Sequence, residues 1–145
     1  MKKKPHLKFK IINIESIIPH EEFNQEAVDG LCEEIKCSEA FTHPVLVDKK
    51  TGLLIDGHHR YNAMRNLGAK IIPAYLVNYN CPNLVAFKEA PGNRIISKKE
   101  ILSMAKQNKL YPKKYTFHAF LESKKNIFHL STYLKKKSTP LKKLL

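Results

Sequence analysis

The segment from Leu53 to Gly68, LLIDGHHRYNAMRNLG, constrains the fold of this 145-residue chain more than any other. A short apolar run ends at Asp56, a glycine follows, and apolar residues at helical spacing then continue to Leu67. Gly57 permits a sharp turn and close approach to the backbone. Gly68 is a good C-terminal stop for a helix. The segment therefore predicts a strand, a tight turn and a helix from about Gly57 to Leu67.

The first turn of that helix, which carries His58, His59 and Arg60, predicts an anion site. Backbone N–H groups at a helix N-terminus lack partners inside the helix, and the helix dipole makes this end positive. Imidazole and guanidinium groups add donors for phosphate oxygens. Asp56, just before the turn, can hold a cation such as Mg²⁺ or orient a histidine. The turn is not a P-loop, because the GxxxxGK[ST] spacing is absent.

The residues alone leave a second interpretation of the histidine pair open. Neighbouring residues on a helix point about 100° apart, so His58 and His59 are a poor chelating pair for one zinc ion. One of them can instead be a buried histidine that is hydrogen-bonded within the core.

Apolar patterns elsewhere predict a single mixed α+β domain. Strands are expected at 7–14, 44–47, 53–55 and 71–79, and helices after the N-cap residues Asn24 and Ser97. Pro73 places the strand at 71–79 at a sheet edge or a strand start. Residues 80–96 predict a loop, and the end of the chain is expected to fray into Lys135-Lys136-Lys137. The expected division is a domain over 1–123 and a basic C-terminal extension over 124–145.

Composition and charge narrow the class of protein. Hydrophobic residues make up 43% of the chain, which is enough for a core, but no apolar run approaches the ~20 residues of a membrane helix. Three cysteines without CxxC spacing and no signal sequence predict reduced thiols and a cytoplasmic protein. Residues 81–145 hold 15 Lys and Arg against 3 Asp and Glu. This excess indicates an anionic partner or simple solubility.

The Asp56-Gly57-His58-His59-Arg60 turn, followed by Leu67-Gly68-Ala69-Lys70, resembles the ParB/sulfiredoxin superfamily, and more narrowly its free L-serine kinases. The resemblance extends to Pro19-His20-Glu21 before the first acidic helix and to the pattern Tyr111, Lys114, Thr116 and His118. It covers roughly residues 10–120 and implies a mixed sheet with packed helices.

The resemblance also implies an activity and a set of site residues. These enzymes transfer the terminal phosphoryl group of ADP or ATP, with Mg²⁺, to the hydroxyl of free L-serine, which supplies O-phosphoserine for cysteine synthesis. The implied catalytic residues are Glu21 and Asp56, with Asp56 also the candidate ligand for Mg²⁺. The implied phosphate-binding residues are Gly57, His58, His59 and Arg60, and the implied substrate-binding residues are Lys114, Thr116 and His118.

Departures from the family and its neighbours bear on this hypothesis. The family usually has Lys-[Ser/Thr]-Thr where this chain has Lys114-Tyr115-Thr116, and the region between Tyr79 and Ser97 is short. Sulfiredoxins carry a cysteine at the position of His58. The alternative hypothesis is a ParB-like regulator that binds nucleic acid, which the basic second half favours. The turn disfavours it, since it has two histidines and an acid instead of an arginine cluster.

Overall fold

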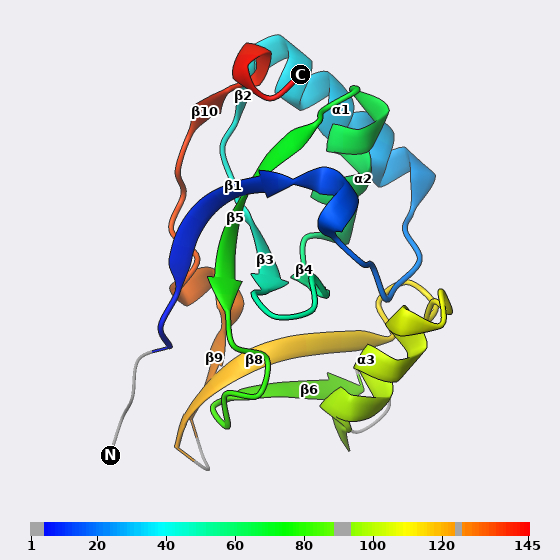
Figure 1. Ribbon diagram of the computed structural model, residues 1–145, viewed down its shortest axis with the longest axis vertical. Coiled ribbons are helices and arrows are strands. Elements are labelled where there is room, and N and C mark those ends of the chain that lie inside the picture. Colours follow the sequence, from blue (N-terminus) through cyan, green and yellow to red (C-terminus); the bar gives the residue numbers. More distant parts are fainter. Residues whose placement is uncertain (1–4, 89–93, 124–125) are drawn as a thin grey trace.

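The computed structural model describes residues 5–88, 94–123 and 126–145, with the backbone alone at 122–123, 126–129 and 131. Its helices and strands alternate in the way an α+β domain requires, which confirms the predicted fold class (Figure 1). The elements, with η for 3-10 turns, are β1 (Lys8–Asn13), η1 (Ile14–Ser16), α1 (Gln25–Ser38), β2 (Ala40–Phe41), β3 (Val45–Asp48), β4 (Leu54–Asp56), α2 (His58–Asn66), β5 (Ile71–Val77), β6 (Leu84–Lys88), β7 (Ile95–Ile96), α3 (Lys98–Lys106), β8 (Thr116–Ser123), β9 (Asn126–His129), η2 (Leu130–Thr132), β10 (Thr139–Pro140) and η3 (Leu141–Lys143).

The first sheet has the strand order β1-β5-β3-β4. Strand β5 runs antiparallel to β1 and parallel to β3, so it is a central strand. The edge position predicted from Pro73 is therefore wrong. Pairing with β3 begins only at Ala74, while Pro73 faces Ile11 of β1, so the strand is paired on one side at the proline. A proline is tolerated at such a locally edge-like point.

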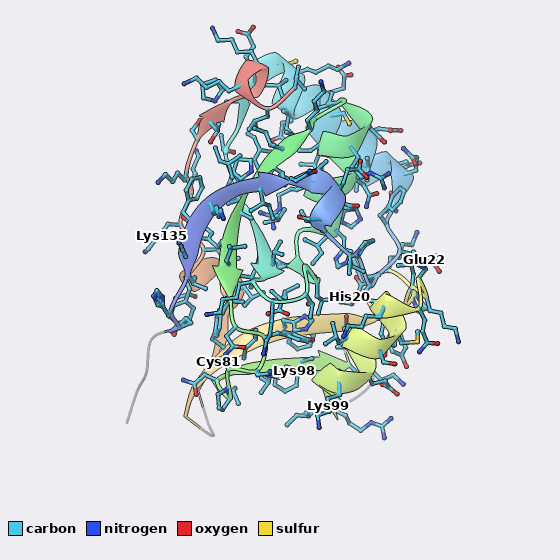
Figure 2. The ribbon with its side chains drawn as sticks, viewed as in Figure 1. His20, Glu22, Cys81, Lys98, Lys99 and Lys135 are labelled. Carbon is cyan, nitrogen blue, oxygen red and sulfur yellow. The ribbon has the colours of Figure 1, made fainter. Side chains whose placement is uncertain are left out.

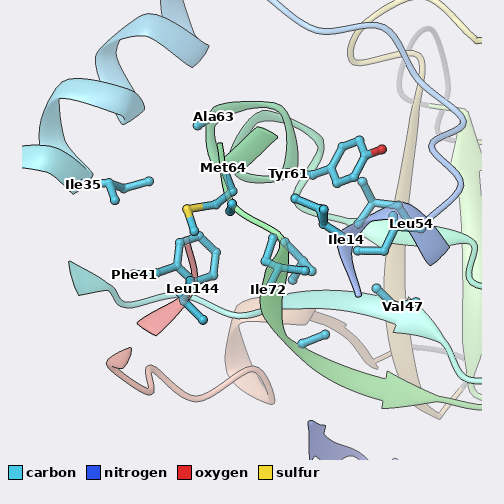
Figure 3. Close-up of a cluster of buried hydrophobic side chains, with 14 of the residues drawn as sticks. Ile14, Ile35, Phe41, Val47, Leu54, Tyr61, Ala63, Met64, Ile72 and Leu144 are labelled. Carbon is cyan, nitrogen blue, oxygen red and sulfur yellow. The ribbon is translucent and has the colours of Figure 1, made fainter. Parts of the chain in front are cut away.

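Strand β3 is buried on both faces and separates two hydrophobic cores. Val45 and Val47 point into the first core, beneath α1 and α2, together with Met64 and Ile72 (Figure 3). Leu46 points the other way, into the second core. Because each face of a strand takes alternate side chains, the continuous apolar run predicted for 44–47 is what a doubly covered strand requires.

A second sheet, in the order β7-β6-β8-β9, lies below the first in Figure 1. Its β6–β7 pair occupies part of the region predicted as a loop, so that prediction is wrong over 84–88 and 95–96. Prolines and a glycine in this region suggested turns, whereas β6 is specified by antiparallel pairing with β8, more than 30 residues away. The second core joins the two sheets through Leu46, Leu53, Ile55, Val77, Tyr79, Leu84, Ala86, Ile101, Ala105, Tyr111, Phe120 and Leu130.

Three helices begin and end near the predicted residues. The Asn24 side chain accepts from the Ala27 N–H at 3.1 Å, which confirms this N-cap. Ser97 accepts from the Glu100 N–H at 3.3 Å, while the Glu100 carboxylate accepts from the Tyr111 hydroxyl at 3.2 Å instead of closing a full capping box. Gly68 has φ +84°, as expected after α2. No helix in the described part of the chain is long and apolar enough to cross a membrane.

The end of the chain packs on the domain, so the predicted fraying is wrong. Thr139–Pro140 pair with β2, and the Leu144 carbonyl accepts from the Lys70 N–H at 2.9 Å. Leu144 is fully buried in the first core, beside Phe41 (Figure 3). The lysines that follow Leu134 hid this return, because a charged run predicts a solvated segment regardless of what lies beyond it.

Candidate active site

Every site residue expected from the sequence lines one of two adjoining cavities. The main cavity, of about 450 Å³, is lined by Glu21, Asp56, His58, Arg60, Thr116 and His118 among others. The side cavity, of about 400 Å³, shares five of these and adds Gly57, His59 and Lys114. Four separate chain segments thus meet at one place. The main cavity has the size of a typical small-molecule site.

Glu21 is held at the wall of both cavities by hydrogen bonds from the segment before β8. Its Oε1 accepts from the Lys114 backbone N–H at 2.9 Å. Its Oε2 accepts from the Thr116 backbone N–H at 3.2 Å and from the Thr116 hydroxyl at 2.8 Å. Lys114 has φ +58°, a costly conformation for a residue with a side chain. The structure therefore orders the carboxylate in one geometry.

The loop that carries Glu21 is also tied to α2 by the two histidines. The His20 N–H donates to His58 Nε2 at 3.1 Å, and the Asn24 N–H donates to His59 Nε2 at 3.0 Å. Each Nε2 must therefore carry a lone pair, which leaves Nδ1–H as the donor of each neutral ring. A phosphate can accept a hydrogen bond only from those Nδ1–H groups or from the backbone of α2.

The turn before α2 needs glycine for two reasons. Gly57 has φ +105°, and a Cβ there would lie 2.7 Å from Val45 Cγ1 and 2.9 Å from Arg60 Nη2. The Arg60 guanidinium donates to the carbonyls of His43 and Pro44 at 2.8 and 2.9 Å and to Asp56 Oδ2 at 3.1 Å. Arg60 thus holds β3 to α2 while its half-buried charge stays beside the cavity.

His20, His58 and His118 form a buried histidine cluster between the two sheets. The ring centroid of His20 lies 4.5 Å from that of His58 and 5.5 Å from that of His118. Burial lowers the pKa of His20 to about 4, and burial followed by the neighbouring rings lowers the pKa values of His58 and His118 well below their ordinary value. All three rings are therefore neutral near pH 7 and bind by hydrogen bonds, not by charge.

Two members of this site did not stand out in the sequence. His20 is 1% exposed and donates or accepts through both ring nitrogens, to the Leu54 carbonyl at 2.8 Å and the Thr116 hydroxyl at 3.3 Å. Tyr79 lies 2.8 Å from His118 Nε2 through its hydroxyl. The only signal for His20 was its place beside Glu21; nothing local marked Tyr79, which reaches the site through sheet pairing.

Asp56 fits the expected magnesium ion as one carboxylate ligand. No group of three or more His, Cys, Asp and Glu side chains that could hold a metal ion occurs among the residues described. Asp56 keeps 43% of its side chain exposed beside the cavities, with one oxygen on Arg60. Mg²⁺ in phosphoryl-transfer sites is commonly held by one or two carboxylates and the substrate phosphates together. The residues present suit an ion that arrives with a nucleotide.

Comparison with known sequences gives one family and several enzymes. The model of the ParB N-terminal domain matches residues 2–88. An ATP-dependent L-serine kinase from Staphylothermus marinus is 32% identical over 78 residues, which is 51% of this chain and 31% of that enzyme. An ADP-dependent L-serine kinase from Thermococcus kodakarensis is 32% identical over 75 residues, 49% of this chain and 31% of that enzyme. The match thus spans about a third of each curated relative.

Comparison with solved structures extends the likeness of fold over the whole chain. A variant of a free serine kinase, solved in complex with ADP, superposes with a TM-score of 0.77. The superposition covers 100% of this chain and 97% of that one, at 15% sequence identity. The second sheet and the C-terminal return therefore belong to the same fold as the part matched by sequence.

Proposed function

Because the chain belongs to the ParB N-terminal domain family, we propose that it is a free L-serine kinase. The observation that carries this proposal is the meeting of Glu21, the α2 N-terminus and Thr116 around one cavity. The proposed reaction transfers the terminal phosphoryl group of ADP or ATP to the hydroxyl of free serine, in the cytoplasm that the free cysteines favour. Sequence relatives bearing that activity support it.

In this proposal Glu21 accepts the proton of the serine hydroxyl. Its carboxylate is oriented by two backbone N–H groups and one hydroxyl, so little reorganisation is needed before the reaction. A carboxylate within reach of a hydroxyl acts as a general base or positions the attacking oxygen. Lys114, Thr116 and His118, on the segment that orients Glu21, are the groups proposed to hold serine.

The N-terminus of α2 is proposed to hold the nucleotide phosphates. Gly57 allows the backbone to approach a ligand, and the N–H groups of the first turn point away from the helix toward the side cavity. Arg60 adds the positive charge that phosphoryl transfer requires, since His58 and His59 are neutral donors. Burial and then Lys114 and Lys113 lower the pKa of His59.

Asp56 is the residue proposed to hold Mg²⁺ together with the phosphates. When bound, the ion neutralises phosphate charge and fixes the orientation of the phosphoryl group. Arg60 keeps the Asp56 carboxylate at the mouth of both cavities through its bond to Oδ2. No oxygen of Asp56 has to leave the core to meet an ion there, because the side chain is already partly exposed.

The test is phosphorus NMR of the purified protein with L-serine, Mg²⁺ and either ADP or ATP. The expected result is a phosphoserine signal, with AMP formed from ADP or ADP formed from ATP, which also identifies the donor. Absence of phosphoserine with both donors, from protein shown to be folded, would refute the proposal. A steeply salt-dependent affinity for DNA would then favour the ParB-like alternative.

Two neighbouring glutamates supply the matched control. Glu21→Gln is expected to lower the rate at least ~100-fold, the usual contribution of a general base. Glu22→Gln should leave the rate unchanged, because Glu22 is exposed on the same loop and lines neither cavity (Figure 2). Equal rates for the two variants would remove Glu21 from the mechanism.

A further inference from the structure

A continuous hydrogen-bonded chain leads from Glu21 into the buried histidine cluster. Glu21 Oε2 lies 2.8 Å from the Thr116 hydroxyl, which lies 3.3 Å from His20 Nε2. His20 Nδ1 lies 2.8 Å from the Leu54 carbonyl oxygen. His20 and Thr116 are 1% and 7% exposed, so water does not compete for these bonds. The chain couples the candidate base to a residue that touches the cavity from inside the core.

The direction of each bond follows from the groups that take part. A carbonyl oxygen only accepts, so His20 Nδ1 carries the hydrogen and donates it to Leu54. In the neutral ring Nε2 then carries a lone pair. While Glu21 is a carboxylate, it only accepts, and the single hydrogen of the Thr116 hydroxyl points to Oε2. The Thr116 oxygen and His20 Nε2 then face each other with lone pairs.

Protonation of Glu21 reverses this arrangement. A carboxylic acid with its proton on Oε2 donates to the Thr116 oxygen, and the hydroxyl hydrogen can then turn to His20 Nε2. Every donor in the chain now has an acceptor, and the facing lone pairs are gone. Thus the protonated state of Glu21 gains one hydrogen bond that the ionised state lacks. Only the hydroxyl rotates; the heavy atoms keep their positions.

We propose that His20 is a positioning residue which, through the Thr116 hydroxyl, stabilises Glu21 after it has taken up a proton. The inference rests on the proposed kinase function, in which the proton comes from serine. The serine oxygen forms its bond to the terminal phosphorus as its hydrogen passes to Glu21. The bond from that phosphorus to the bridging oxygen breaks, and its electron pair leaves with the nucleotide. His20 gains no proton in this step.

Other groups face this chain and set the background for a titration. Lys114 donates its backbone N–H to Glu21, and Asp56 and Arg60 line the same cavities. His58, Tyr111 and His118 pack against the His20 ring. Their charges act on Glu21 through space, with or without the Thr116 hydroxyl. A double-mutant cycle therefore separates them from the relay.

The experiment follows the Glu21 carboxyl carbon by ¹³C NMR as pH is lowered, with its signal assigned by its loss in Glu21→Gln. Four proteins are compared: the unaltered chain, His20→Asn, Thr116→Val and the double variant. Asparagine keeps a donor near the Leu54 carbonyl but has no acceptor at the Nε2 position. His20→Asn is expected to lower the pKa of Glu21 by about half a unit to one unit relative to its effect in the Thr116→Val background.

Two further variants guard against a merely structural effect. His20→Gln, which can place an amide oxygen near the Nε2 position, should restore the pKa of Glu21, and Thr116→Ser should preserve it. Thermal unfolding shows whether each variant is folded. An equal shift by His20→Asn in both backgrounds, or no shift in either, would overturn the relay. Since this readout needs no turnover, it stays distinct from a failure to make phosphoserine.

Discussion

Acid should destabilise this protein well above the pH at which carboxylates are protonated, because the histidine cluster is buried in its neutral form. The pKa of His20 is about 4 in the folded chain, against 6.5 for the ordinary side chain. Between these values the unfolded chain binds more protons than the folded one, so the free energy of unfolding falls as pH falls. The stability from neutral His20 is complete above about pH 6.5 and is lost down to about pH 4.

The size of the effect follows from the two pKa values of His20. A shift of this extent corresponds to about 3 kcal/mol in all, of which about 2 kcal/mol is lost on going from about pH 7.5 to about pH 5. His58 and His118 act in the same direction, since burial lowers the pKa of each. The loss is large for a domain of this size, whose total stability is expected near ~5–15 kcal/mol.

Urea unfolding at both pH values measures this loss. In His20→Gln the fall in the free energy of unfolding between the two pH values should be smaller by about 2 kcal/mol than in the unaltered chain. His6→Gln is the matched control, because His6 is exposed and lies outside the cluster. A free energy of unfolding that is the same at both pH values, or an equal effect of both substitutions, would refute the reasoning.

Three further predictions concern stability and are checked by urea unfolding. Leu144→Ala should cost about 2–5 kcal/mol, because Leu144 is fully buried, while Leu145→Ala, at a position 52% exposed, should cost far less. Gly57→Ala should cost more than ~1 kcal/mol and lower kinase activity, since its φ is +105° and its Cβ would clash with Val45. Ser97→Ala should cost about 1 kcal/mol through the lost N-cap of α3. A cost near zero for any of the three buried or capping positions would contradict its assigned role.

Sequence patterns identified the elements whose signals are local. The glycine at 57, the caps at Asn24 and Ser97 and the buried run before Asp48 each act within a few residues, through backbone conformation or a short hydrogen bond. The same local pattern placed the anion-type turn at the start of α2, and the family resemblance placed Glu21 and Thr116 in one site. All of these residues do line adjoining cavities.

Only the tertiary structure decided how the polar side chains of this site are used. The alternative that one histidine of the pair is buried and hydrogen-bonded holds for His58, whose Nε2 accepts from a residue 38 positions away. The second sheet, the buried Leu144 and the chain from Glu21 to His20 likewise depend on segments far apart in sequence. Contacts of this kind leave no periodic signal, because they depend on which surfaces meet after the local elements have formed.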